Sequence, residues 1–268
     1  MASKAEKINS IRWGLRQAVR DSGYGGPDVW GVDGFYPADH RLSYDITFAP
    51  LLTSIGHPNL TGVVTHRKSQ GLSTHVLDVM GGAYLLPEAD SLTGVRLQNV
   101  DGDVLAHRED NVRLYSYKEA NRKLAEAQGA FAEQTAEKRT VIAGDVFSDD
   151  TWEKIATRGK ELGNSGLYDM VFFRPWGGIP RFFTSQIEKS PEQNKLFEKL
   201  LLGVFQRSVR VLSPTGIMLF QTPENLVNRV NVFARAIRRR TMWDCKIAPQ
   251  PLIGDDFRFG YIGPKEHH

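Results

Sequence analysis

Cysteine is nearly absent from this sequence of 268 residues, since Cys245 is the only one. A single cysteine excludes an internal disulfide and any zinc site built from several cysteines. The histidines show no spacing typical of metal ligands, and a lone histidine is usually structural. The sequence therefore predicts no metal site.

Long apolar runs and strong charge are also missing. No run approaches the roughly 18 residues that span a bilayer, and the first residues, MASKAEKINS, contain no apolar signal-peptide core. The net charge of +3 does not indicate a nucleic-acid-binding protein. We therefore expect a cytoplasmic protein with no membrane partner.

Three common catalytic or cofactor motifs do not occur. The sequence has no Walker-type phosphate loop and no Gly-x-Ser-x-Gly elbow, which are typical of P-loop enzymes and of many serine hydrolases. It also lacks the Gly-x-Gly-x-x-Gly spacing of dinucleotide-dependent oxidoreductases, which disfavours that class.

The first part of the chain differs in character from the rest. Residues 5–20 carry an apolar stripe at helical spacing, and residues 21–72 begin rich in Gly, Pro and Asp. Several aromatic residues there need a surface to pack on: Trp30, Phe35, Tyr36 and Phe48. We therefore predict an N-terminal cap over residues 1–72, covering the substrate side of an α/β domain over 73–268.

Two basic clusters leave two interpretations open. Arg12, Arg16 and Arg20 recur beside the first apolar stripe, and the second cluster is Arg235 with Arg238 to Arg240. Each is either a solvated helix face or a contact for a phosphate-bearing substrate.

From residue 74 onward, predicted strands alternate with predicted helices, which favours a parallel sheet. The strands are expected at residues 74–80, 92–100, 140–146, 168–174, 216–221, 241–248 and 257–262. The helices are expected at residues 118–137, 151–162, 191–212 and 224–239, the second of them capped by Asp149 or Asp150. The last two strands have no helix between them.

Four segments carry the strongest functional pattern. The run THVLDVMGG, residues 74–82, is a buried strand followed by a glycine turn, which is how an α/β sheet brings its backbone close to a ligand. Later segments follow in order: TVIAGDVF with Asp145, YDMVFFRPWGG with Arg174, and VLSPTGIMLFQTP. In this order they resemble the class I S-adenosylmethionine-dependent methyltransferases.

The resemblance implies a Rossmann-like, mostly parallel seven-stranded sheet flanked by helices, with the last strand antiparallel. It also implies S-adenosylmethionine as cofactor. Asp78, Gly81 and Gly82 take the places of the family's acidic residue and glycine turn. Met80 and Tyr84 stand where the family often has glycine.

The resemblance assigns the ribose and the adenine to the next two strand ends. Arg96 falls where the family has a ribose-binding carboxylate, and Asp101 is either its replacement or a solvated turn residue. Asp145 would accept a hydrogen bond from the adenine amino group. Gly144 precedes it, and Val146 and Phe147 would wall the ring.

Arg174 and Trp176 follow the fourth strand, where the family places groups that orient the acceptor. An arginine cannot accept a hydrogen bond, so it disfavours an amine held in the Asn-Pro-Pro-aromatic manner and favours an anionic acceptor. The alternative is a structural ion pair. The sequence thus predicts methyl transfer to an unidentified acceptor, or a methyltransferase-like scaffold that has lost catalysis.

Overall fold

The protein is described from a computed structural model. The residues described are 48, 51–79, 86–96, 136–144, 146–173, 191–223, 226–240, 242–248 and 257–265. Among these, no helix is long and apolar enough to cross a membrane. The predicted helices over 5–20 and most of 118–137 lie outside the described residues.

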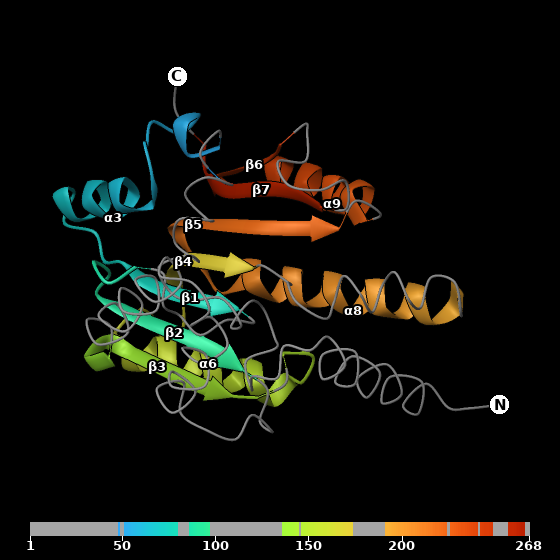
Figure 1. The fold of residues 1–268 in the computed structure, drawn as a ribbon, viewed down its shortest axis with the longest axis horizontal. Helices are drawn as coiled ribbons and strands as arrows, with labels where there is room; N and C mark the ends of the chain where they lie inside the picture. The colour runs from blue at the N-terminus through green and yellow to red at the C-terminus, as the bar shows by residue number, and fades with distance from the viewer. Residues whose placement is uncertain are drawn as a thin grey trace, which may run out of the picture.

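A single seven-stranded sheet forms the centre of the molecule, in the order β3-β2-β1-β4-β5-β7-β6 (Figure 1). The first five strands pair in parallel, and β7 runs antiparallel to both β5 and β6. The predicted fold class is therefore confirmed. The strands are β1 His75–Val79, β2 Ser91–Arg96, β3 Arg139–Ala143, β4 Tyr168–Phe173, β5 Leu212–Pro223, β6 Trp243–Ile247 and β7 Phe257–Pro264.

Parallel strands give the sheet two functionally different ends. We call the end where β1, β4 and β5 begin the amino edge and the end where they finish the carboxyl edge. In Figure 1 the helix α3 lies toward the amino edge, and the arrowheads of β1, β4 and β5 point to the carboxyl edge. Ligands of open α/β sheets bind at the carboxyl edge.

One face of the sheet is covered by three helices, α6 Asp149–Glu161, α8 Pro191–Arg210 and α9 Val227–Arg240. Their apolar residues form one core with every second strand residue, because side chains alternate between the faces of a strand. Leu77, Phe173 and Phe220 belong to this core. Phe205 of α8 packs edge-on against Phe220, with ring centroids 4.9 Å apart.

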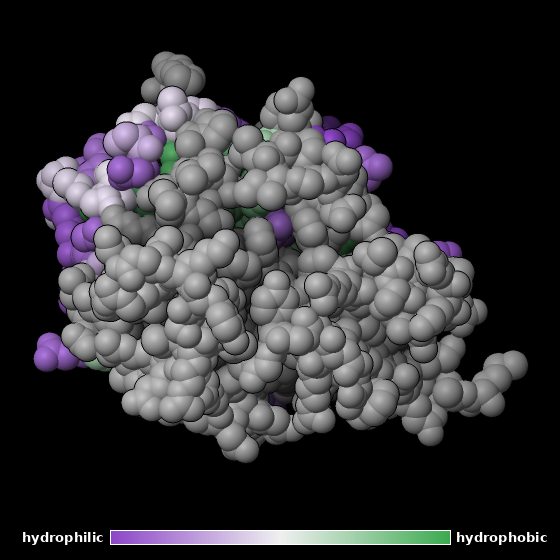
Figure 2. All heavy atoms as spheres, in the orientation of Figure 1, coloured by the Kyte–Doolittle hydropathy of each residue, from purple (hydrophilic) through white to green (hydrophobic). Residues whose placement is uncertain are grey.

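The opposite face carries α3, Leu60–Ser69, and a second core. Val63 and Val64 pack there with the strand residues Val76, Phe172 and Leu219. In Figure 2 hydrophilic residues colour the rim of the molecule over α3, so the helix turns its polar side outward. Residues of the predicted cap thus share a core with the sheet. The boundary at residue 72 stays a prediction.

Local capping differs from the sequence-based expectation at one helix. Ser148, and not Asp149 or Asp150, is the N-cap of α6, although its side chain makes no capping hydrogen bond. Both aspartates lie in the first turn, where negative charge favours a helix N-terminus. Asn59 caps α3 by accepting a hydrogen bond from the Gly62 amide at 2.8 Å.

The fifth strand starts earlier than predicted, at Leu212 instead of residue 216. Helix α8 ends at Arg210, two residues before the predicted Leu212, and the Ser-Pro-Thr-Gly run lies within β5 instead of ending the helix. Its register against β4 shifts between Tyr168 and Met170, so that residues 213–216 bulge opposite Asp169. Gly216 is required in this bulge, because a Cβ there would come within 3.0 Å of the Asp169 carbonyl oxygen.

Candidate functional site

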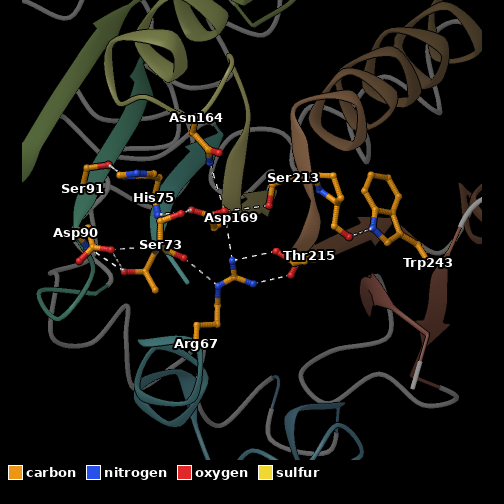
Figure 3. A network of polar contacts seen from close by, with 12 residues as sticks. Arg67, Ser73, His75, Asp90, Ser91, Asn164, Asp169, Ser213, Thr215 and Trp243 are labelled. Atoms are coloured by element: carbon orange, nitrogen blue, oxygen red, sulfur yellow. Dashed lines mark hydrogen bonds and ion pairs between the residues drawn. The ribbon is translucent and has the colours of Figure 1, made fainter. Parts of the chain in front are cut away.

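A buried carboxylate organises the amino edge of the sheet. Asp169, the second residue of β4, is 3% exposed. Its Oδ2 accepts hydrogen bonds from the Ser73 hydroxyl and the His75 amide, both at 2.9 Å. Its Oδ1 accepts from the Ser213 hydroxyl at 2.9 Å and the Asn164 amide at 3.3 Å (Figure 3).

Arg67 of α3 supplies the opposite charge. Its Nη2 lies 3.3 Å from Asp169 Oδ1, and both side chains are almost fully buried. The guanidinium also donates to the Ser73 carbonyl at 3.1 Å and to the Thr215 carbonyl. Burial lowers the pKa of Arg67, and the carboxylate of Asp169 opposes that shift. An arginine remains protonated under such conditions.

Two further contacts extend this edge to β2. Asp90 accepts hydrogen bonds from the Thr74 amide and hydroxyl at 2.8 and 2.9 Å, and pairs with Lys68 at 2.9 Å. Burial would raise the pKa of Asp90, but the hydrogen bonds from Lys68 and Thr74 outweigh it and hold the pKa below its usual range.

We call the set Arg67, Ser73, His75, Asn164, Asp169, Ser213 and Thr215 the Asp169 network. Asp169 receives four hydrogen bonds and one ion pair, so its lone pairs are already used by the protein. The network joins α3 to β1, β4 and β5 at the edge opposite to the one where ligands of such sheets bind. We therefore interpret it as structural.

The carboxyl edge holds the predicted cofactor residue Asp78. It is the penultimate residue of β1, is 2% exposed and pairs in register with Gly94 of β2 and Phe172 of β4. Because Val76 packs on the α3 side, the alternation of the strand places Asp78 on that side too. A buried carboxylate thus lies at the carboxyl end of β1, the middle one of the five parallel strands. Its contact with a cofactor stays a prediction.

At the end of β3 the structure describes three of the predicted residues. Gly144 is buried, and a Cβ there would collide with the side chain of Thr151 in α6, so packing alone requires a glycine. Val146 and Phe147 are 5% and 9% exposed and belong to the core that α6 covers. The indole of Trp152 donates to the Val146 carbonyl at 2.8 Å, which fixes this turn. Their contact with adenine stays a prediction.

The remaining predicted site residues follow the ends of β1, β2, β3 and β4 in the sequence. β2 does end at Arg96, the position that the sequence aligns with the ribose carboxylate. The residues that lie outside the described part of the chain are Gly81, Gly82, Asp101, Asp145, Arg174 and Trp176.

One polar residue at the carboxyl edge was missed by the sequence analysis. Gln221 of β5 is 2% exposed, and its Oε1 has no hydrogen-bond partner among the described residues. It is one position beyond Phe220, which pairs with the last residue of β4, Phe173. The signal that could have identified it is a glutamine directly after the apolar run Ile-Met-Leu-Phe.

Comparison with known proteins gives similarity at the level of the fold. The sequence matches no protein-family model and no curated protein. Among solved structures, an rRNA methylase from Streptococcus thermophilus is 8% identical with a TM-score of 0.37, covering 72% of this chain and 89% of its own. An O-methyltransferase from Bacillus cereus, solved with S-adenosylhomocysteine, is 11% identical with a TM-score of 0.38, covering 75% and 78%.

A third similar structure is an O-methyltransferase from Streptomyces achromogenes involved in tomaymycin synthesis, solved with S-adenosylmethionine. It is 12% identical with a TM-score of 0.38, covering 82% of this chain and 88% of its own. The strand order and the antiparallel β7 are those expected of a class I methyltransferase fold.

Proposed function

We propose that the protein transfers a methyl group from S-adenosylmethionine to an acceptor bound at the carboxyl edge of the sheet. The observation that carries this proposal is the strand order, with β7 inserted antiparallel between β5 and β6. The buried carboxylate of Asp78 at the carboxyl end of β1 supports it.

The described residues fit such a cofactor. The ends of β1 and β3 are separated only by β2, and Gly144 lies three residues beyond Val141, the position in register with Asp78. Asp78 and Gly144 are therefore about 14 Å apart, given about 4.8 Å between strands and about 3.3 Å per residue. That separation suits a nucleoside with an attached amino-acid chain lying across the edge. Asp78 with Gly81 and Gly82 would hold the amino-acid end, Asp101 the ribose, and Asp145 the adenine amino group.

The chemistry needs little from the protein beyond positioning. When bound, the cofactor would supply a methyl group activated by its sulfonium for in-line transfer to an acceptor lone pair, with the carbon–sulfur bond breaking and the neutral thioether S-adenosylhomocysteine as leaving group. The task of the chain is to exclude water and to align the acceptor with that methyl group. We assign this role to Arg174 and Trp176, with the guanidinium binding an anionic group on the acceptor.

Asp145→Ala tests the cofactor assignment. Removal of the carboxylate should weaken S-adenosylhomocysteine binding by about 1–3 kcal/mol, the cost of a buried donor left unpaired. Asp149→Ala is the matched control, because this exposed carboxylate pairs with Arg207 on the surface. Calorimetric titration of both variants gives the affinities. Unchanged affinity in a folded Asp145→Ala protein would refute the assignment.

A second candidate function is supported by the departures from the family pattern. Met80, Arg96 and Arg174 replace residues that the family uses for the cofactor and the acceptor. They favour a binding or scaffold protein that keeps the fold without the reaction. The same titration separates the two functions, because the enzyme requires S-adenosylhomocysteine to bind to the wild-type protein and the scaffold does not.

A further inference from the structure

Gln221 is an unusual residue for its position. The residue is only 2% exposed, yet its amide oxygen accepts no hydrogen bond from any described residue. A buried acceptor without a partner lowers stability, and such groups are rare in folded proteins. An oxygen of this kind at a ligand-binding edge is satisfied when a ligand brings a donor.

The other buried polar atoms without a hydrogen-bond partner differ from Gln221 Oε1, because they belong to groups that interact through other atoms or lie away from a strand end. In the described part of the chain, Glu88 Oε2 belongs to a carboxylate whose Oε1 accepts from Thr61, and the unpaired nitrogens of Arg158 and Arg207 belong to ion-paired guanidinium groups. Arg139 also interacts through other atoms. Thr93 lies in the middle of β2 and not at a strand end.

The register places Gln221 relative to the proposed cofactor. Leu219 belongs to the core on the α3 side, so Gln221 points to that side as well, as Asp78 does. Asp78 pairs with Phe172, and Phe172 pairs with Leu219. Gln221 is therefore two strands across and two residues further toward the carboxyl edge, about 12 Å from Asp78 by ordinary strand dimensions.

An aromatic residue lies next to Gln221 on the neighbouring strand. Phe259 of β7 is the register partner of Gln221 and is 1% exposed. Phe48, from the predicted cap, packs edge-on against Phe259 with ring centroids 5.4 Å apart. An amide oxygen next to a buried phenylalanine forms the kind of site that orients an apolar part of a ligand through one polar contact.

We propose that Gln221 binds the methyl acceptor, with its Oε1 accepting a hydrogen bond from a hydroxyl or amine N–H on an apolar part of the ligand, away from the anionic group assigned to Arg174. This inference rests on the proposed function only in identifying the ligand as the methyl acceptor. The binding of a donor-bearing aromatic ligand by Gln221 can be measured without any methyl transfer.

Gln221→Met provides the first test, because methionine has a similar length and no hydrogen-bonding requirement. If the oxygen has no partner in the protein, the variant should keep or raise the melting temperature. Ser213→Ala is the matched control, because that buried hydroxyl donates to Asp169 at 2.9 Å. The control should lose about 2–4 °C, the effect of one buried hydrogen bond in a domain of this size. A similar loss in Gln221→Met would overturn the proposal.

The second test uses phenol and its methyl ether, anisole, as probes of the protein saturated with S-adenosylhomocysteine. Ligand-observed NMR should show that the wild type binds phenol about tenfold more tightly than anisole, the preference expected of one neutral hydrogen bond in a buried site. Aniline and N,N-dimethylaniline test the amine donor in the same way. The preference should fall to about twofold or less in Gln221→Met.

Each outcome of the second test decides the question. No preference for the donor in the wild type, or the same preference in Gln221→Met, overturns the proposal. Gln221→Met should keep the wild-type affinity for S-adenosylhomocysteine. If the wild type does not bind S-adenosylhomocysteine, the proposed function fails, and the probes are then titrated without it to decide the role of Gln221 alone.

Discussion

The Asp169 network at the amino edge and Gln221 at the carboxyl edge differ in how their buried polar groups are satisfied. At the amino edge, Asp169 accepts from four donors and pairs with Arg67, so the polar groups satisfy one another. At the carboxyl edge, the buried oxygen of Gln221 has no partner among the described residues. A polar network that is complete stabilises the fold, whereas an incomplete one is open to a ligand. The comparison separates residues that hold the sheet together from residues available for binding.

The largest expected effect is at the amino edge. Asp169→Ala should lower the free energy of unfolding by about 3–5 kcal/mol, because it leaves the buried charge of Arg67 without its partner. Urea unfolding measures the loss. In the double variant Arg67→Met, Asp169→Ala, the loss should be clearly smaller than the sum of the two single losses. If the remaining folded Asp169→Ala protein bound S-adenosylhomocysteine more weakly, the amino edge would not be purely structural.

The next effect concerns alkaline stability. Burial raises the pKa of Tyr168 to about 12, and its hydroxyl donates to the Ile155 carbonyl at 3.0 Å. The unfolded tyrosine ionises near pH 10, so the stabilisation is complete below that pH and is lost as the pH rises toward 12. The loss should reach about 2–3 kcal/mol. Tyr168→Phe should remove this pH dependence at a cost of about 1 kcal/mol at pH 7.

Comparison of wild type and Tyr168→Phe by urea unfolding at pH 8 and pH 11 isolates the contribution of this hydroxyl from that of other groups. The two proteins should converge in stability at pH 11. An equal loss of stability in both would show that Tyr168 does not control it.

At the carboxyl edge, Gly144→Ala tests whether this buried glycine serves packing, cofactor binding or both. The new methyl group would collide with Thr151, so we expect a destabilisation of about 1–3 kcal/mol from overpacking. Thr151→Ala in the same chain removes the nearest atoms and should restore much of the stability. S-adenosylhomocysteine affinity is then measured in the double variant. Weak binding in the restored protein would give Gly144 a cofactor role besides packing, and full binding would assign it to packing alone.

The smallest effect is expected at Asp90, on the exposed rim of the amino edge. The Lys68 and Thr74 contacts hold the pKa of its carboxyl below the usual range. The stabilisation is therefore present above the unfolded value of about 3.9 and is lost as the pH falls through the folded value. Asp90→Asn should cost less than about 1 kcal/mol at pH 7, since the pair is exposed. Thermal unfolding should show no difference from wild type at pH 2.5.

The sheet could be predicted from sequence because its strands are short apolar runs bounded by clear breaks. Tyr-Asp-Met-Val-Phe-Phe forms β4, and the two terminal strands were predicted from apolar runs without a helix between them. Their antiparallel direction was implied by the resemblance to class I methyltransferases. The start of β5 could not be predicted, because Pro214 and Gly216 are typical of a break, whereas here they form a bulge within the strand.

The polar residues of the two edges differed in how far the sequence could identify them. Asp78 was identifiable, because an acidic residue between a strand and a glycine pair is a local pattern. The Asp169 network was not, because its members come from five separate places in the sequence and meet only through folding. Gln221 was missed for a related reason. Its significance lies in an absent partner, which no local pattern reveals.

The long-range contacts of Arg67 have a consequence for the order of folding. Its guanidinium bonds to Thr215, 148 residues further along the chain, and Asp169 bonds to Ser73, 96 residues away. Closing such loops is slow, and contacts of this separation typically form late. Because an unpaired Arg67 would be costly to bury, α3 is expected to dock only after β4 and β5 have assembled beside β1. Amide protons of β1 and β4 should accordingly exchange through global unfolding rather than through local opening of this edge.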